Sequence, residues 1–120
     1  MPSKIDKVPR RLLDIVENVD AALKFVADLN YEQFAKDNKS QYAVIRALEI
    51  ISEASRHIPD DIKAKHPEIP WRAVRDAGNA YRHAYLSVTL EVVWETVARD
   101  LEPLRSAMIA ELRFRGVQVE

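Results

Sequence analysis

Apolar residues recur three or four positions apart along nearly the whole chain, and this spacing constrains the fold more than any other feature. Residues spaced in this way lie on one face of an α-helix, which turns about 100° per residue. Only two glycines, Gly78 and Gly116, occur in 120 residues, whereas turn-rich β folds use glycine in many of their turns. The abundance of Ala, Leu, Glu, Arg and Lys also favours helices. We therefore predict an all-α protein.

The first half of the chain contains two long amphipathic segments. A helix is predicted over about residues 10–29, because Pro9 suits a helix start, and a short helical turn follows at about residues 30–34. A second long helix, capped by Asn38 or Ser40, is predicted to end at Pro59. The predicted core positions of these helices are Leu12, Ile15, Val16, Val19, Leu23, Val26, Val44, Ile45, Leu48, Ile51 and Ile58.

The second half begins with a loop, because three prolines lie between Pro59 and Pro70. Trp71 opens a third helix, and Ser87 or Thr89 caps a fourth. Its predicted core positions are Leu90, Val93, Trp94, Val97 and Leu101, with Trp94 either a core residue or an anchor between two copies. Pro103 either kinks this helix or restarts it, since Leu104, Met108 and Leu112 continue the period. Short links between four or five helices predict an antiparallel bundle.

Length and composition indicate a single domain, residues 1–120, with a tail over about 114–120 that is expected to fray. No run approaches the roughly 20 apolar residues of a membrane span, and the first residues lack the apolar stretch of a secretory signal. The chain has no cysteine, which excludes disulfides and thiolate metal sites and fits the cytoplasm. The net charge is −1, so any contact with nucleic acid must come from a local cluster.

Such a cluster lies in the segment WRAVRDAGNAYRHAY, residues 71–85, which holds three arginines, an asparagine and a histidine. On a helical wheel that starts at Arg75, Asn79 falls near about +40°, Arg82 near about −20° and His83 near about +80°. One arc therefore presents two guanidinium groups, an amide and an imidazole. Arginine binds phosphate bidentately, and histidine transfers protons near neutral pH. The arc is typical of a site that binds or cleaves a phosphodiester.

Other interpretations of the polar residues stay open. Arginine and asparagine on an exposed helix face often contact only water, and a single histidine is often structural. Glu49, Glu53 and His57 follow one another at intervals of four, which is formally a metal-binding face or else a solvated stripe. Val74, Ala77 and Tyr81 lie on the side of the wheel opposite the polar arc and are predicted to face the core.

The motifs PWRAVRDAGNAYRHAYLSV, LEVVWETVARDLEPL and YAVIRALEIISEAS together resemble the HepT-like branch of the HEPN superfamily over most of the chain. Members of this family are small helical bundles, usually dimers, and many are metal-independent ribonucleases. They act as toxins that MNT-type nucleotidyltransferase antitoxins neutralise. The resemblance therefore implies an RNA substrate, a homodimer, such an antitoxin as partner, and no cofactor.

The family motif contains Arg, then a polar residue, a short spacer, and His-x-Tyr. By this resemblance, Asn79 is the polar residue, His83 the catalytic histidine and Tyr85 the tyrosine to which the antitoxin transfers AMP. The motif arginine falls on Gly78, a departure for which Arg82 or Arg75 compensates by its position on the wheel.

The preceding helix adds one residue by resemblance, because Glu53 lies near a Glu-Ala position of the family. This implies that Glu53 faces the dimer cleft and orients the catalytic side chains. Two hypotheses follow for the whole protein. It is either a ribonuclease toxin, or a catalytically degenerate HEPN module that binds its partner or a nucleotide without cleaving RNA.

Overall fold

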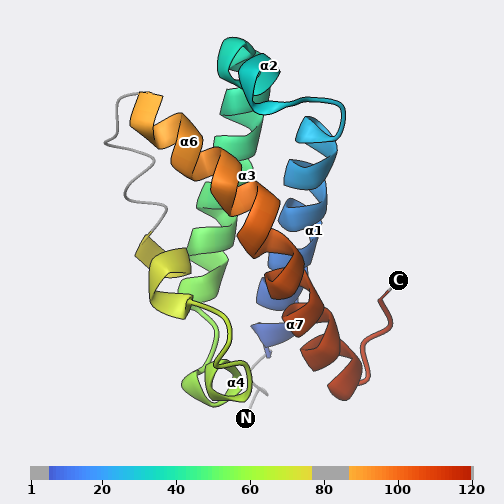
Figure 1. Ribbon diagram of the computed structural model, residues 1–120. Helices are drawn as coiled ribbons and strands as arrows, with labels where there is room; N and C mark the ends of the chain where they lie inside the picture. The colour runs from blue at the N-terminus through green and yellow to red at the C-terminus, as the bar shows by residue number, and fades with distance from the viewer. Residues whose placement is uncertain (1–5, 77–86, 120) are drawn as a thin grey trace.

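The computed structural model describes residues 6–76 and 87–119 of the chain. Every regular element within these two ranges is a helix (Figure 1), which confirms the all-α prediction. In chain order the elements are α1 (Val8–Val26), α2 (Tyr31–Lys36), α3 (Asn38–Arg56), α4 (Asp60–Lys65), a helix over residues 71–76, α6 (Ser87–Glu95), the π-helical segment η1 (Thr96–Asp100) and α7 (Leu101–Phe114).

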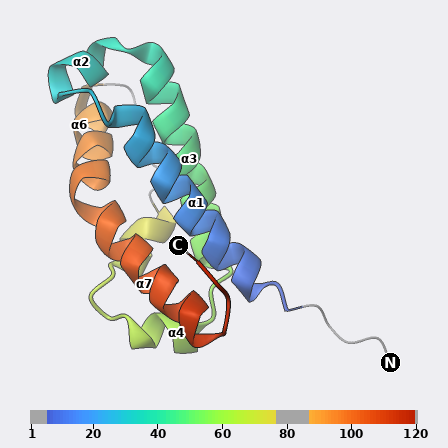
Figure 2. The ribbon, with the colours of Figure 1, turned by 90° about the vertical axis from the view of Figure 1, so that its right-hand side faces the viewer.

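The two longest helices, α1 and α3, lie side by side and run in opposite directions (Figure 1). The continuous rod of α6, η1 and α7 crosses their shared face, with α7 antiparallel to α1 (Figures 1 and 2). The short helix α2 covers one end of the bundle, and α4 lies at the other end. This is the antiparallel bundle that the apolar spacing predicts. No helix in the described part of the chain is long and apolar enough to cross a membrane.

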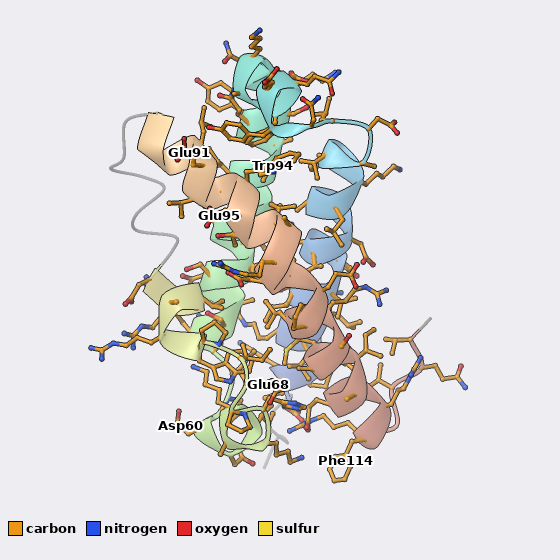
Figure 3. The ribbon with its side chains drawn as sticks, in the orientation of Figure 1. Asp60, Glu68, Glu91, Trp94, Glu95 and Phe114 are labelled. Carbon is orange, nitrogen blue, oxygen red and sulfur yellow. The ribbon has the colours of Figure 1, made fainter. Side chains whose placement is uncertain are left out.

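The core forms where the apolar faces of α1, α3 and α7 meet. Among the described residues, most predicted core positions are buried, and the others are partly buried and pack against the core. Ala77 and Tyr81, which were also predicted to face the core, lie outside the described residues. Trp94 is one of the partly buried residues. The centroid of its ring lies 5.3 Å from the ring centroid of the fully buried Phe34 and 6.1 Å from that of Tyr31. On the same helix Glu91 and Glu95 are exposed (Figure 3). Trp94 therefore joins α6 to α2 within one chain, as its prediction as a core residue requires.

The link between α1 and α2 is set by a capping box. The Asn30 side chain accepts a hydrogen bond from the backbone N–H of Gln33 at 2.8 Å, and the Gln33 side chain accepts one from the N–H of Asn30 at 2.9 Å. This exchange satisfies two backbone donors that a helix start leaves without partners. It fixes the start of α2, so α1 ends at Val26, three residues before the predicted end.

The cap of α3 is Asp37, so the prediction of Asn38 or Ser40 was wrong. The Asp37 carboxylate accepts hydrogen bonds from the backbone N–H of Ser40 at 3.2 Å and from its hydroxyl at 2.8 Å. These bonds hold the pKa of Asp37 below its ordinary value. Asn38 is the first residue of the helix, and Ser40 donates to the cap rather than forming it.

The segment that was predicted as a proline-bounded loop contains the helix α4, so that prediction was wrong. Pro59 takes an extended conformation directly before the helix. Asp60 and Asp61 occupy the first turn, where negative charge interacts favourably with the helix dipole. Ile62 is buried and anchors the helix on the core. Proline therefore marks the start of a helix here.

Pro103 does not restart the last long helix, which continues and bends near it (Figure 2), as the alternative of a kink predicts. The helix instead passes through η1, where its turns widen. The Thr96 hydroxyl donates to the carbonyl of Val92 at 2.8 Å, a type of bond that bends helices. Pro103 has no N–H for the carbonyl of Arg99, and its ring crowds that carbonyl. The rod bends in this region (Figure 2).

At the N-terminal end of the rod, α6 includes Ser87. Thr89 therefore lies within this helix and does not cap it.

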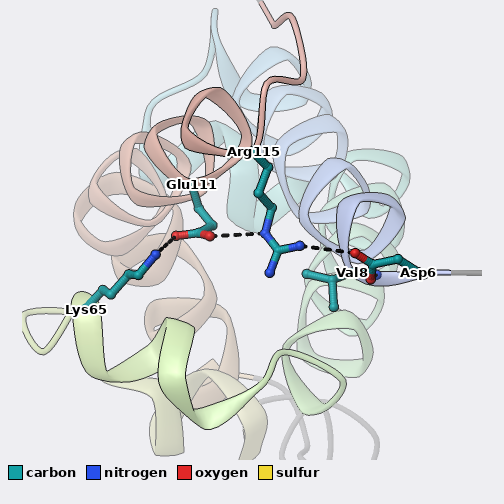
Figure 4. Close-up of polar contacts among 5 residues, drawn as sticks. All are labelled: Asp6, Val8, Lys65, Glu111 and Arg115. Carbon is teal, nitrogen blue, oxygen red and sulfur yellow. Dashed lines mark hydrogen bonds and ion pairs between the residues drawn. The ribbon is translucent and has the colours of Figure 1, made fainter.

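A cluster of charges closes the α4 end of the bundle (Figure 4). The carboxylate of Glu111, 3% exposed, accepts hydrogen bonds from Lys65 Nζ at 3.0 Å and from Arg115 Nε at 3.1 Å. Arg115 Nη1 also contacts Asp6 Oδ2 at 3.2 Å. Burial alone raises the pKa of Glu111, but the bonds from Lys65 and Arg115 outweigh it and hold the pKa below its ordinary value.

The chain leaves α7 through a left-handed glycine, Gly116, whose φ is +81°. The N–H of Val117 bonds to the carbonyl of Leu112 at 2.9 Å, and that of Gly116 bonds to the carbonyl of Arg113 at 3.0 Å. This pair of bonds is the Schellman motif. Val117 and Val119 then pack against the core, which differs from the frayed tail that the sequence led us to expect.

Candidate functional site

The start of the polar segment is fixed on α3 by a hydrogen bond from a buried serine. Ser52, 2% exposed, donates its hydroxyl proton to the backbone carbonyl of Arg75 at 2.7 Å. The two residues are 23 positions apart. A hydrogen bond between elements is directional, so it orients the helix over residues 71–76 in a way that apolar packing does not. Ser52 lies directly before Glu53, so the bond brings together the two parts of the chain that the sequence singles out.

Trp71 anchors the other end of this helix. Its indole N–H donates to the carbonyl of His66 at 3.1 Å, its ring packs partly buried against the core, and Lys63 Nζ lies 5.9 Å from the ring centroid. His66 thus supplies its backbone carbonyl to Trp71, and its side-chain Nδ1 lies 3.6 Å from Oε1 of Glu68. Val74 packs against the core from the same helix, as predicted. The helix is therefore held at both ends.

The side chain of Arg75 remains open to solvent. It is 47% exposed, and its Nε atom lies 3.1 Å from Oδ1 of Asp76, which is 56% exposed. Exposed pairs of this kind contribute little to stability, about 0–1 kcal/mol. The guanidinium group of Arg75 is therefore held only weakly by Asp76, and a phosphate can compete for it.

Glu53 points away from the core, and its contact is on its own helix. Its Oε1 atom lies 3.2 Å from Nε2 of His57, and the two side chains are 56% and 46% exposed. The hydrogen bond with His57 lowers the pKa of Glu53, burial opposes this slightly, and the charges of His57, Arg56 and Arg11 add to the lowering. Glu53 is therefore ionised at neutral pH, as a residue that orients a cation or an imidazolium must be. Within residues 6–76 and 87–119, no group of three His, Cys, Asp or Glu side chains is placed to hold a metal ion.

A pocket of about 370 Å³ lies between α3, the helix over residues 71–76 and the rod of α6, η1 and α7. Its aliphatic walls suit an apolar group rather than a phosphate. Polar groups from Asp76, Arg99 and Asp100 also line it, and Arg99 already pairs with Asp100 at 3.2 Å. The described residues that line it are Leu48, Ile51, Pro70, Ala73, Val74, Asp76, Val92, Thr96, Arg99, Asp100, Leu101 and Leu104.

Four of the predicted site residues, Asn79, Arg82, His83 and Tyr85, lie outside the described residues, as does Gly78. Their grouping on one helical face therefore stays a prediction. The described residues add Ser52, which the sequence interpretation missed.

A signal for Ser52 is present in the helical spacing. Ser52 lies four residues after Leu48, and Ser55 lies four after Ile51, so both serines belong to the buried face of α3. A hydroxyl group in that position needs a partner inside the protein. The spacing alone does not say which residue supplies it.

Comparison with known proteins places the chain in a family. The family model described as "Ribonuclease HepT-like" matches residues 15–110, a range that runs from α1 into α7 and includes both Ser52 and the segment 71–85. The chain belongs to the ribonuclease HepT-like family. This confirms the resemblance that the motifs indicate.

Individual relatives of the HepT-like chain agree with this. It is 46% identical over 94 residues to "Probable ribonuclease HepT" of Thermococcus cleftensis, covering 78% of this chain and 86% of that protein. It is 37% identical over 97 residues to a protein of Methanocaldococcus jannaschii that is named a putative RNase, and the match covers 81% of this chain and 78% of that protein. It is also 30% identical over 99 residues to a protein of Caldanaerobacter subterraneus that is named a putative RNase, and the match covers 82% of this chain and 88% of that protein. No solved structure matches the chain.

Proposed function

We propose that this protein is an endoribonuclease that cleaves RNA without a metal ion, and that it is the toxin of a toxin–antitoxin pair. The observation that carries the proposal is the family membership, since relatives that match most of the chain are named as ribonucleases. The cytoplasm, where RNA and the antitoxin are both present, is the compartment in which it would act.

The reaction we propose is attack by a ribose 2′-oxygen on the adjacent phosphorus. His83 accepts the 2′-hydroxyl proton as general base, the bond from phosphorus to the 5′-oxygen breaks, and the leaving oxygen takes up a proton. The products are a 2′,3′-cyclic phosphate and a free 5′-hydroxyl. Arg82 or Arg75 stabilises the negative charge that grows on the phosphorane oxygens, and Asn79 positions the phosphate.

The described part of the site supports these roles in two respects. The guanidinium group of Arg75 is half exposed and pairs with an exposed carboxylate, so a phosphate can recruit it at little cost. The nearby pocket is largely aliphatic, so its lining suits a phosphate poorly. Both observations favour phosphate contact along the polar arc of the segment.

The alternative function is a catalytically degenerate HEPN module that binds its partner or a nucleotide without cleaving RNA. Gly78 at the position of the motif arginine favours it, because glycine has no guanidinium group to bind the phosphate. This alternative predicts binding to the same partner with no RNA cleavage in either the presence or the absence of that partner.

The test is cleavage of a labelled single-stranded RNA by the purified protein in the presence of EDTA. We expect 2′,3′-cyclic phosphate ends, and we expect His83→Ala to abolish them. His57→Gln and His66→Gln are matched controls, because they remove the chain's other two imidazoles. If cleavage survives in His83→Ala, the nuclease assignment is contradicted. If the wild-type protein binds its nucleotidyltransferase partner or a nucleotide but cleaves no RNA, the protein is the degenerate module.

We further propose that an MNT-type nucleotidyltransferase neutralises the protein by transferring AMP to Tyr85. The transfer joins the Tyr85 oxygen to the α-phosphorus of ATP and releases pyrophosphate. A bulky anion two residues from His83 blocks access of RNA and repels its phosphates. Mass spectrometry after co-expression is expected to detect one added AMP group, which is lost in Tyr85→Phe and kept in Tyr81→Phe. An adduct that persists in Tyr85→Phe would refute this site.

A homodimer completes the proposal, because the net charge of one chain is only −1 and two facing copies of the polar arc would concentrate their arginines in one cleft. Glu53 would face this cleft and orient His83 or Arg82. Light scattering combined with size-exclusion chromatography measures the mass in solution. A mass of one chain at micromolar concentration would contradict the dimer.

A further inference from the structure

The hydroxyl groups of Ser52 and Ser55 are chemically alike but differ in what they hold. Both serines are buried, with 2% and 0% of their surfaces exposed. Each donates a hydrogen bond of 2.7 Å to a backbone carbonyl. Ser55 bonds to Ser52, three residues back on its own helix. Ser52 bonds instead to Arg75, on a different helix.

The position of Arg75 determines where the rest of the polar segment begins. Asn79 follows four residues later in the sequence, Arg82 seven and His83 eight. Arg75 is itself one of the two arginines of the proposed mechanism, so a displacement at Arg75 moves a group that the reaction uses and the point from which the chain continues to the other three. Misplacement of a catalytic group by about 1 Å can cost on the order of 100-fold in rate.

A hydroxyl group suits this task better than an apolar contact. Ala73 and Val74 of the same helix line an aliphatic pocket, and apolar contacts of this kind are non-directional. The bond from Ser52 has one donor and one acceptor, so it selects one register of the helix on α3. The carbonyl of Arg75 has a second lone pair, so this bond leaves the carbonyl able to accept another.

We propose that Ser52 is a positioning residue for the ribonuclease site, and that its bond to the carbonyl of Arg75 fixes on α3 the point from which the catalytic segment continues. This inference rests on the proposed function. The bond is made to the backbone of Arg75 and not to its guanidinium group, so its loss lowers the rate of the chemical step while the exposed groups that bind RNA are kept.

The test compares Ser52→Ala with Ser55→Ala, since each removes one buried hydroxyl group from the same helix. We expect similar losses of thermal stability in the two variants. We expect kcat for RNA cleavage to fall on the order of 10–100-fold in Ser52→Ala, with KM changed less than about twofold. Ser55→Ala is expected to keep kcat within about twofold of the wild-type value.

Two further variants separate the hydrogen bond from the volume of the side chain. Ser52→Thr keeps a hydroxyl donor and is expected to restore most of kcat. Ser52→Cys has a similar size, but its thiol is a weak donor, so it is expected to behave like Ser52→Ala. Equal kcat values in Ser52→Ala and Ser55→Ala, or full activity in Ser52→Cys, would overturn the inference.

The outcomes also separate this inference from the function on which it rests. Cleavage that requires His83 but not Ser52 refutes the positioning role and leaves the nuclease intact. Cleavage that requires neither residue, or no cleavage by the wild-type protein, refutes the proposed function and the inference together.

Discussion

Nζ of Lys65 lies 3.0 Å from Oε1 of Glu111, a residue 46 positions later in the chain whose carboxylate is almost fully buried. This bond ties the end of α4 to α7, and Arg115 binds the other oxygen of the same carboxylate at 3.1 Å. The Lys65 ammonium also lies 4.0 Å from the centroid of the Phe114 ring. One buried negative charge thus binds two cations at the end of the bundle (Figure 4).

Replacement of this charge should destabilise the fold. Glu111→Gln is expected to lower the free energy of unfolding by about 1–3 kcal/mol, because hydrogen bonds to charged groups are worth this much and two are weakened. Urea denaturation at pH 7 measures the change. Glu95→Gln, at an exposed position of α6, should stay within about 0.5 kcal/mol of the wild-type value. Equal stabilities of the two variants would contradict a stabilising role for the cluster.

The same carboxylate should make stability depend on acid pH. The pKa of Glu111 in the folded protein lies below the ordinary value of 4.5, so the folded state binds its proton less readily than the unfolded state does. Its contribution is therefore fully present above about pH 4.5 and is lost as the pH falls through the lowered pKa. We expect the free energy of unfolding to fall less steeply below pH 4.5 in Glu111→Gln than in the wild type. Parallel curves would show that Glu111 is not the group responsible.

The contact between α2 and α6 depends on Phe34, which is fully buried beside Trp94. Phe34→Ala is expected to cost about 3–5 kcal/mol, the usual range for removing a buried aromatic ring. Phe25→Ala is the matched control, because Phe25 is 42% exposed on α1. It should cost clearly less in the same thermal or urea denaturation. A loss below about 1 kcal/mol in Phe34→Ala would mean that α2 is not held by this ring.

Two asparagines near the start of α2 and α3 test the assignment of the helix caps. Asn30→Ala removes the capping box and is expected to cost about 1 kcal/mol, within a range of about 0.5–2. Asn38→Ala is expected to be neutral or slightly stabilising, because Asn38 is the first helical residue and Asp37 is the cap. Denaturation of both variants measures this difference. The reverse order of stability would restore Asn38 as the cap.

The departure at Gly78 leads to a prediction about the two nearby arginines. Loss of the group that stabilises the phosphorane charge should lower kcat on the order of 10²–10³-fold. Arg82→Gln and Arg75→Gln, measured side by side in RNA cleavage, identify which guanidinium group has this role. If neither variant loses more than about tenfold, neither arginine replaces the motif residue.

The helices could be predicted because their buried faces repeat at regular intervals, as Leu12, Ile15, Val16 and Val19 do. Features that depend on competition between neighbours could not. Asp37, Asn38 and Ser40 are all good caps, and only the backbone geometry selects the first. The helix α4 was missed because prolines end helices but also precede them. Burial of Ile62 in the core stabilises the helix that follows Pro59.

Residues of the candidate site could be predicted only where the type of side chain by itself indicates a chemical role. Arg75 and Glu53 were named from charge, spacing and resemblance, and the fold brings the residue next to Glu53 into contact with the backbone of Arg75. Ser52 was missed because its role depends on a partner 23 residues away, and no local pattern encodes that distance. The widened turn of η1 was missed as well, because the period of the apolar residues continues through it.

The cluster around Glu111 joins residues from both ends of the chain, so it cannot form until nearly the whole chain has been synthesised. Asp6 and Arg115 are 109 positions apart, and at about 5–20 residues per second a ribosome needs roughly 5–20 s to travel from one to the other. The helices α1 and α3 have both been made well before then, and they can pair while α7 is still missing. During that interval their shared apolar face lacks its cover and is open to chaperones and to other nascent chains. The newborn protein is therefore most vulnerable to aggregation just before α7 is added.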